Sequence, residues 1–398
     1  MLVSKPGGWR STIGCWGFDR PGIEGNRPAF APSALALAVG SYSEPTIYHL
    51  RSAICHLPSA ICHRAIVRRR SSQKRRVESA AGLRQLPGVR FPGTCLCGWL
   101  LLLGGAPAEE QRFSFERPLM GTRFAIICHG TEEAVAKAAA DEAFAEGEKI
   151  NAVASDYLPD SELMRLPAGG AAVGVSPLLA ELLDVSRTMA ERCDGVFDPT
   201  LGPLTVLWRE SRRTGELPAA EARGHAMAAC GWRELEVDGK ARTVRLKKPG
   251  MRLDLGGIAK GFAADRMFEV MMKHGFERTC IAAGGDLRLG DPPPGKTGWK
   301  VGLKTFDVEK PEEVVELSNC AVSTSGDLHQ FVEIGGKRYS HILDPRTGLG
   351  LTERLAVSVI APTATVSDAL ATACCVTGAA GAEEFGLKRG ATRVIVRK

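Results

Sequence analysis

The stretch Met251-Arg-Leu-Asp-Leu-Gly-Gly-Ile-Ala-Lys-Gly-Phe-Ala-Ala-Asp265 constrains the fold most, because its hydrophobic period changes within a few residues. Apolar residues alternate around Asp254, which predicts a strand, and a helical pattern follows Gly256-Gly257. A Gly-Gly turn and the unpaired N–H groups of a helix start suit a phosphate, and Lys260 adds a cation. A plain strand-turn-helix joint with an exposed lysine explains the same residues, so this stretch alone leaves both interpretations open.

The net charge of +6 is unevenly distributed along the 398 residues. Residues 1–108 hold 14 Lys and Arg against 4 Asp and Glu, whereas residues 109–398 hold 37 against 41. The basic excess therefore lies outside the part with globular patterning. Nothing in that part suggests a basic surface of the kind that binds nucleic acid, so we expect no nucleic-acid partner.

Two segments precede the part that is predicted to fold. Residues 1–90 are rich in Gly, Pro, Ser and Arg without apolar periodicity, which predicts a disordered or non-native N-terminal extension. Residues 89–108 combine a charged start, a short apolar run and the A-x-A sequence Ala106-Pro-Ala108. This layout is typical of a signal peptide, with an uncleaved membrane anchor as the alternative. Either would place residues 109–398 in the periplasm or on the outer face of the inner membrane.

Within residues 109–398, helical patterns alternate with several hairpins rather than with single strands. Asp238-Gly239 and Gly335-Gly336 each separate two short alternating runs. Ser176-Pro177 and Ser367 are placed to begin helices, and Thr131 is placed to cap an Ala-rich one. This order predicts an α+β fold with mixed or antiparallel sheets and packed helices.

Polar residues in two further stretches could carry chemistry. Asp368 and Thr372 are four residues apart on one predicted helix face, and their hard oxygen atoms suit Mg²⁺ bound together with phosphate. A helix-start carboxylate and a back-bonding threonine are the ordinary alternative. In Ser340-His-Ile-Leu-Asp-Pro-Arg-Thr-Gly348, His341 could act as a general base. Arg346 could bind phosphate or simply pair with Asp344.

Eight stretches together resemble the ApbE family of FAD:protein FMN transferases, in the family order and over about residues 112–398. They are Met120-Gly-Thr, Tyr157-Leu-Pro-Asp-Ser-Glu-Leu, Phe197-Asp-Pro-Thr-Leu-Gly-Pro-Leu, Leu253-Asp-Leu-Gly-Gly-Ile-Ala-Lys-Gly, Ala283-Gly-Gly-Asp, Val322-Ser-Thr-Ser-Gly-Asp, Ser340-His-Ile-Leu-Asp-Pro-Arg-Thr-Gly and Ser367-Asp-Ala-Leu-Ala-Thr. Each stretch alone is a weak signal, but eight in order are specific. The resemblance implies an ApbE-like, T-fold-like domain over residues 109–398.

The resemblance also implies a reaction: FMN moves from FAD to a Thr or Ser hydroxyl of an acceptor protein, and AMP is released. The usual acceptors are extracytoplasmic subunits of membrane redox complexes. By resemblance, Mg²⁺ binds the Gly257 carbonyl, Asp368 and Thr372, and His341 accepts the hydroxyl proton. The residues implied to bind FAD are Met120, Tyr157, Val196, Phe197, Asp198, Asp254, Lys260 and Val357.

The chain departs from the family pattern at three places. Leu328-His329 stand where many members carry an aromatic residue, and Leu349-Gly350 replace a common Tyr-Pro. Ala371 stands where some members carry a third acidic metal ligand, which implies a metal site with fewer acidic ligands.

Two other functions fit the same residues. Water could replace the acceptor hydroxyl, giving a Mg²⁺-dependent FAD pyrophosphatase that produces FMN and AMP. A non-catalytic FAD-binding protein is the third interpretation. Free FMN as the only product would indicate the second function, and tight FAD binding without turnover the third.

Overall fold

The computed structural model describes residues 48–49, 109–303, 306, 313–327 and 330–398. Apart from the short strand β1 (Tyr48–His49), the segments predicted as an extension and as a signal peptide lie outside the described residues. So does the Leu328-His329 departure. Within the described part of the chain, no helix is both long enough and apolar enough to cross a membrane.

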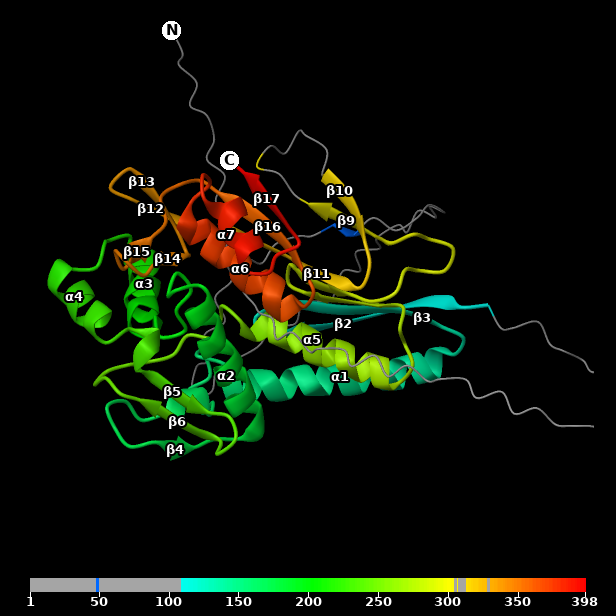
Figure 1. The fold of residues 1–398 in the computed structure, drawn as a ribbon, viewed down its shortest axis with the longest axis horizontal. Coiled ribbons are helices and arrows are strands. Elements are labelled where there is room, and N and C mark those ends of the chain that lie inside the picture. The colour runs from blue at the N-terminus through cyan, green and yellow to red at the C-terminus, as the bar shows by residue number, and fades with distance from the viewer. Residues whose placement is uncertain (1–47, 50–108, 304–305, 307–312, 328–329) are drawn as a thin grey trace, which may run out of the picture. The chain divides into compact units, whose positions relative to one another are not determined.

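A seven-stranded sheet forms the centre of the fold, and every neighbouring pair of its strands is antiparallel (Figure 1). Its order is β17 (Arg393–Arg397), β16 (Ala356–Ala361), β11 (Cys320–Gly326), β8 (Asp286–Leu289), β7 (Thr279–Ala283), β3 (Thr122–Gly130) and β2 (Gln111–Leu119). The predicted α+β class with antiparallel sheets is confirmed.

Helices cover one face of this sheet. They are α1 (Glu133–Ala154), α5 (Ala259–Lys273), α6 (Ala364–Thr377) and α7 (Ala382–Lys388), whereas α2 (Pro177–Arg192) packs against α1. Every second residue of a strand faces these helices. Phe124, Ile281 and Val359 are examples whose fully buried side chains belong to the main core. The small buried alanines of α1, among them Ala136 and Ala140, allow α1 and α5 to lie side by side (Figure 1).

The opposite face of the sheet is covered by β9 (Trp299–Leu303) and β10 (Glu313–Leu317), with β1 beside β9. Trp299 and Val301 pack there against Ile127, Leu289 and Val322. Because both faces are buried, the central strands are nearly continuous apolar runs rather than alternating ones.

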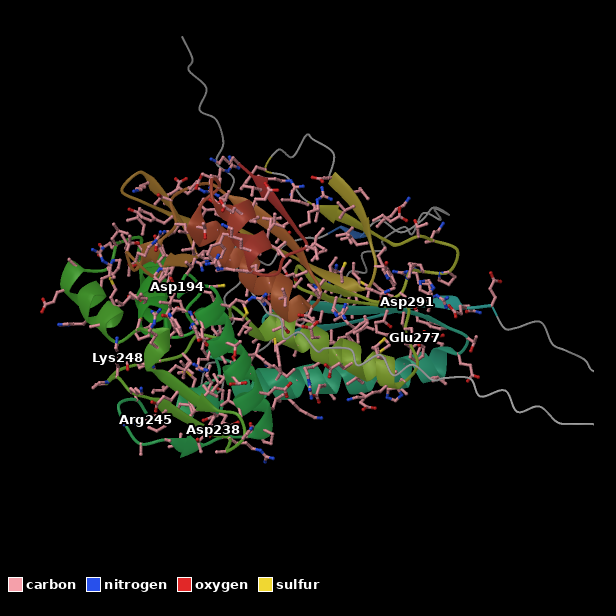
Figure 2. The ribbon with its side chains drawn as sticks, viewed as in Figure 1. Asp194, Asp238, Arg245, Lys248, Glu277 and Asp291 are labelled. Carbon is pink, nitrogen blue, oxygen red and sulfur yellow. The ribbon has the colours of Figure 1, made fainter. Side chains whose placement is uncertain are left out.

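A third apolar cluster joins α3 and α4 to the chain after β11, and Trp208, Leu204 and Tyr339 are buried in it. The elements here are α3 (Gly202–Thr214), α4 (Ala220–Ala228), β12 (Phe331–Ile334), β13 (Lys337–Ser340), β14 (Leu343–Asp344) and β15 (Leu349–Gly350). A small sheet comprises β4 (Val173–Gly174), β5 (Leu235–Asp238) and β6 (Thr243–Leu246). Figure 2 shows Asp238 and Arg245 on its outer side. Two short 3₁₀ helices, η1 (Leu163–Arg165) and η2 (Trp232–Glu234), complete the elements.

Most local signals specify the elements that form. Both predicted hairpins are present, as β5–β6 and β12–β13, and Ser176 accepts a hydrogen bond from the Leu179 N–H at the start of α2. Two predicted caps were wrong. Glu132, not Thr131, precedes α1, and α6 is capped by Thr363, whose hydroxyl accepts from the Val366 N–H. Asp368 therefore lies one turn deeper in its helix than the sequence predicts.

The strand predicted before the Gly-Gly turn does not form. Only an isolated bridge between Leu201 and Arg252 is present. Asp254 explains the difference, because its backbone N–H donates to the Pro199 carbonyl and its Oδ1 accepts from the Gly256 N–H. The segment is held as a capped turn rather than as a member of a ladder.

Candidate functional site

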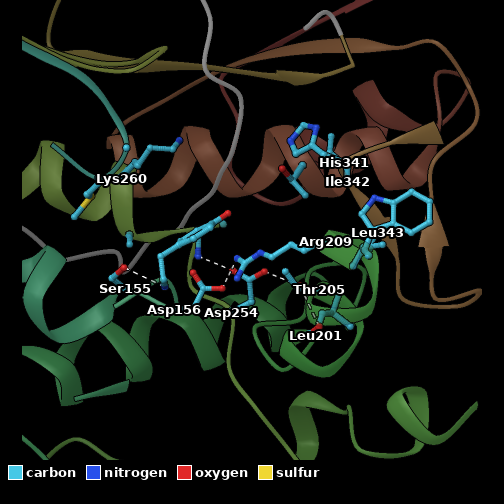
Figure 3. Close-up of a pocket in the computed structure, with 18 of the residues that line it drawn as sticks. Ser155, Asp156, Leu201, Thr205, Arg209, Asp254, Lys260, His341, Ile342 and Leu343 are labelled. Atoms are coloured by element: carbon cyan, nitrogen blue, oxygen red, sulfur yellow. Dashed lines mark hydrogen bonds and ion pairs between the residues drawn. The ribbon is translucent and has the colours of Figure 1, made fainter. Parts of the chain in front are cut away.

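A pocket of about 680 Å³ opens between α3, the Gly256–Lys260 turn, the chain after β13, and α6 (Figure 3). Most of the predicted site residues line it, although they come from distant parts of the sequence. They are Met120, Tyr157, Val196, Phe197, Asp198, Asp254, Gly257, Lys260, His341 and Thr372. Val357 and Asp368 are not part of this lining. The tertiary fold thus gathers the predicted residues around one cavity.

The turn after Asp254 is organised by that carboxylate. Its Oδ2 accepts from the Thr205 hydroxyl (2.7 Å) and its Oδ1 from the Gly256 N–H (2.8 Å). A Cβ on Gly256 would lie 3.0 Å from Asp254 Oδ1, so the glycine permits the tight turn. The turn directs the backbone at buried Gly257 toward the pocket, at the start of α5.

Asp368 lies behind the pocket wall on α6, fully buried. Its Oδ2 accepts from the Gly261 N–H on α5 (3.2 Å), and its Oδ1 has no hydrogen-bond partner among the described residues. Burial, and next the negative Asp286, raise the pKa of Asp368 well above its usual value. One turn further along α6, Thr372 lines the pocket and shares a hydrogen bond with the Ser325 hydroxyl (2.9 Å).

These residues fit a divalent cation. A buried carboxylate oxygen without a partner is costly unless something positive faces it. The nearby Thr372 hydroxyl and the Gly257 turn add hard oxygen atoms of the type that Mg²⁺ prefers. The contact between Asp368 and Gly261 places α6 against the helix that begins just after Gly257.

Lys260 is not the exposed lysine that the plain interpretation of the turn requires. It is 9% exposed, and its Nζ lies 2.7 Å from Asp286 Oδ2 on β8. Asp286 is 1% exposed and belongs to the Ala283-Gly-Gly-Asp286 stretch, to which the sequence alone assigns no role. Lys260 and Asp286 form a buried ion pair at the base of the pocket.

His341 follows β13 directly and points into the pocket (Figure 3). Its Nδ1 lies 3.1 Å from the Gln330 carbonyl oxygen, and its backbone N–H donates to the same oxygen. A carbonyl only accepts, so Nδ1 carries the proton and Nε2 is the basic nitrogen of the neutral ring. Burial lowers the pKa of His341 to about 4, so the ring is neutral at pH 7.

Arg346 takes the simpler of its two predicted roles. Its guanidinium binds both oxygens of Asp344, at 2.8 and 2.9 Å, and also donates to the Val376 carbonyl. It is not among the residues that line the pocket. The motif therefore contributes His341 to the cavity, while Asp344 and Arg346 stabilise the turn that follows.

Two predicted FAD contacts, Asp198 and Val357, have different surroundings in the structure. Asp198 accepts hydrogen bonds from the Thr200 N–H and hydroxyl and from the Trp232 N–H, and burial raises its pKa. It therefore shapes the loop after α2 in addition to lining the pocket.

Val357 is different, since it is fully buried in β16 as part of the main core. Its side chain is not among the residues that line the cavity, because both faces of that strand are covered, so its contact with FAD stays a prediction.

The sequence interpretation missed a charged group on the other side of the pocket. Asp156 forms an ion pair with Arg209 of α3 (Figure 3). The Arg209 guanidinium lies 3.9 Å from the centre of the Tyr157 ring. Burial, and next the nearby Asp254, raise the pKa of Asp156 to about 6. Arg212, one turn along α3, also lines the pocket. The arginines of α3 were the only sequence signal, and a polar surface helix explains them equally well.

A helix-covered antiparallel sheet with carboxylates, cations and a neutral histidine around one polar cavity defines an enzyme that acts on a small molecule. Residues 120–395 match the model of the ApbE family, and this chain belongs to that family.

Relatives and solved structures agree with this assignment. A Treponema pallidum (strain Nichols) protein named FAD:protein FMN transferase is 34% identical over 293 residues, which cover 69% of this chain and 81% of that protein. A Klebsiella pneumoniae (strain 342) protein of the same name is 31% identical and covers 78% of this chain and 93% of its own length. The apo flavinyl transferase ApbE of Pseudomonas stutzeri matches with a TM-score of 0.64 and 28% identity, covering 71% of this chain and 90% of its own. The Thermotoga maritima ApbE protein matches with a TM-score of 0.65 and 29% identity, covering 72% of this chain and 94% of its own.

Proposed function

We infer that this chain is an FAD:protein FMN transferase, which moves FMN from FAD to a hydroxyl group of an acceptor protein and releases AMP. The observation that carries the inference is the convergence of family residues from six parts of the chain on one cavity. Its volume of about 680 Å³ lies in the range of pockets that bury a large ligand. The relatives that carry this enzyme name match most of the chain.

FAD occupies the cavity in this proposal. Lys260, Arg209 and Arg212 supply positive charge for its diphosphate, and the exposed ring of Tyr157 offers a surface for a planar group. The backbone at Gly257 can approach the diphosphate closely. The remaining proposed contacts line the same cavity, namely Met120, Val196, Phe197, Asp198 and Asp254.

Magnesium is proposed to bind the Gly257 carbonyl, Asp368 and Thr372. The Asp368 Oδ1 without a partner supports this site, as does the hydroxyl of Thr372 in the pocket wall. When bound, the ion neutralises charge on the diphosphate oxygens. Ala371 is fully buried and apolar, so this chain has no acidic side chain at that position.

The reaction proposed for these residues is an in-line displacement at phosphorus. The oxygen of the acceptor Thr or Ser attacks the phosphorus of the FMN half, the bond to the AMP phosphate oxygen breaks, and AMP leaves. His341 Nε2 takes the proton of the hydroxyl as the new P–O bond forms. The Gln330 carbonyl keeps the imidazole in the tautomer that this step requires. Lys260, held by Asp286, faces the leaving diphosphate charge.

The acceptor is proposed to be a flavoprotein subunit of a membrane redox complex, located in the periplasm or on the outer face of the inner membrane. The signal-like composition of residues 89–108 supports this location.

The decisive assay uses the full chain with FAD, Mg²⁺ and a recombinant redox-complex subunit that carries its acceptor Thr but no flavin. We expect flavin fluorescence that stays with the subunit on a denaturing gel, together with one AMP per flavin attached. Replacing the acceptor Thr by Ala should abolish the fluorescent band. Production of free FMN without any labelled subunit would instead identify the pyrophosphatase, and FAD binding without AMP release the non-catalytic protein.

A further inference from the structure

Asp286 occupies the centre of a buried charged cluster beside the proposed magnesium site. It lies on β8, is 1% exposed, and receives a hydrogen bond from Lys260 Nζ at 2.7 Å. The Ser323 hydroxyl and the Asp368 carboxyl also lie within hydrogen-bonding reach of its carboxylate. These side chains belong to four elements that pack together in the fold, namely β8, β11, α5 and α6.

The cluster places two carboxyl groups beside one ammonium group. Two carboxylates, Asp286 and Asp368, share the positive charge of Lys260, which acts on both of them. Lys260 nevertheless makes its close contact with Asp286, and Asp368 Oδ1 is left without a hydrogen-bond partner. Asp368 Oδ1 is therefore the oxygen of this cluster that a divalent cation would bind.

We propose that Asp286 is a positioning residue that holds the Lys260 ammonium away from Asp368 and thereby keeps one Asp368 oxygen available to the magnesium ion. This inference rests on the proposed function, because it concerns the same metal site. Asp286 does not touch the metal in this proposal. It acts by determining which carboxylate the lysine binds.

The physical reason is the cost of a buried charge. A buried ammonium group needs a carboxylate partner, and Asp368 is the other carboxylate on which the Lys260 charge acts. If Asp286 were neutral, Lys260 would turn to Asp368 and occupy the oxygen that the cation needs. Replacement of residues that support a metal ligand typically weakens metal affinity by about 10–100-fold.

The test measures Mg²⁺ binding directly by titration calorimetry, at fixed pH and without FAD. We expect Asp286→Asn, which preserves side-chain size, to bind Mg²⁺ at least about tenfold more weakly than the wild type. A crystal structure of metal-free Asp286→Asn should show Lys260 Nζ in contact with Asp368. Equal Mg²⁺ affinity of the variant and the wild type would overturn the proposal.

A double-variant cycle separates this role from simple electrostatics. If Asp286 and Lys260 acted on the metal only through their charges, Lys260→Met would raise Mg²⁺ affinity by the same factor in either background. In the proposed arrangement, Lys260→Met raises affinity much more in the Asp286→Asn background, because it removes the competing ammonium there. If Asp286→Asn folds poorly, the double variant, which lacks an orphaned lysine, is compared with Lys260→Met: the proposal expects equal Mg²⁺ affinities, because Asp286 then has no lysine to hold. Equal factors in the two backgrounds would reject the proposal.

Asp327→Asn is the matched control. Asp327 is also buried, at 3% exposure, but it pairs with Arg338 of β13 rather than with Lys260. Its Mg²⁺ affinity should stay within about twofold of the wild type, since additivity holds for sites without shared partners. The wild type's own Mg²⁺ binding and FMN transfer test the proposed function separately. A wild type that transfers FMN with an Asp286→Asn variant of normal affinity would refute only the role of Asp286.

Discussion

At the scale of single residues, burial decides what His341 can do. The pocket wall and the surrounding cations disfavour the charged imidazolium, which lowers its pKa to about 4. The ring is therefore in the basic form at neutral pH. A low pKa also makes it a weak base. The negative diphosphate of bound FAD should raise the His341 pKa, because it favours the charged imidazolium.

We expect His341→Ala to reduce the FMN transfer rate by about 10²–10⁴-fold, the usual contribution of a general base. The wild-type kcat/KM should fall as the pH drops through about 4, because His341 of the free enzyme takes up a proton there. A pH–rate profile that extends from neutral pH to below the His341 pKa of about 4 measures this. His274→Ala, which removes an exposed histidine paired with Glu142, is the control and should keep its activity. A wild-type acid limb near neutral pH that disappears in the variant would contradict a His341 pKa of about 4.

Asp156 titrates within the range of ordinary assays, since its pKa is raised to about 6. Protonation removes a negative charge from the pocket, so FAD, whose diphosphate is negative, should bind roughly two- to tenfold more tightly as the pH falls through 6. Fluorescence titration of FAD between pH 5 and 7.5 measures this step. Asp156→Asn should remove it, and Asp160→Asn, an exposed neighbour outside the pocket, should leave it intact. A step that persists in Asp156→Asn would assign it to another group.

At the scale of elements, the crossing of α5 and α6 determines the metal corner. A Cβ on Gly261 would lie 2.6 Å from the Ala364 carbonyl oxygen and 3.1 Å from Asp368 Cβ. The glycine therefore lets the two helices approach closely enough for Asp368 to accept from the Gly261 N–H. The N-terminus of α6 is further held by Asp265 of α5, which accepts from the Ala364 and Thr365 N–H groups.

Gly261→Ala should separate these helices. We expect a loss of about 1–3 kcal/mol in the free energy of unfolding, as for other overpacked cores, together with weaker Mg²⁺-dependent transfer. Urea unfolding and the fluorescent gel assay measure the two effects. Gly224→Ala in α4 is the matched control, because nothing lies within 4 Å of its added Cβ, and it should gain about 0.5–1 kcal/mol. Unchanged stability of Gly261→Ala would show that α6 can shift without cost.

Element boundaries show where local rules succeed and where they fail. Ser176-Pro177 and the Gly335-Gly336 hairpin were predicted correctly, because their signals act within a few residues. The predicted cap at Ser367 was wrong because Thr363 offers a second capping hydroxyl one turn earlier. Asp265 then stabilises that earlier start from another helix, and no local rule includes such a contact.

At the scale of the whole molecule, residues 109–398 contain the sheet, its covering helices and the pocket. We expect the mature native protein to begin at residue 109, directly after Ala106-Pro-Ala108, if the signal peptide is cleaved as predicted. Mass spectrometry of the N-terminal peptide of the protein purified from its own cells measures this. Recovery of an intact Met1 would contradict both the cleavage and the proposed location.

The fold class, the family and ten of the residues that line the pocket were predicted from the sequence alone, because short motifs carry their own turns, caps and glycines. The partners of the charged groups emerge only from the folded chain: Asp286 for Lys260, Gly261 for Asp368, and Arg209 for Asp156. The same packing places Val357 in the core instead of the pocket. Turns and caps depend on hydrogen bonds between near neighbours, which a local pattern can specify. Burial and ion pairing depend instead on which distant elements pack together, and that determines which charges have partners and which oxygen remains for a metal.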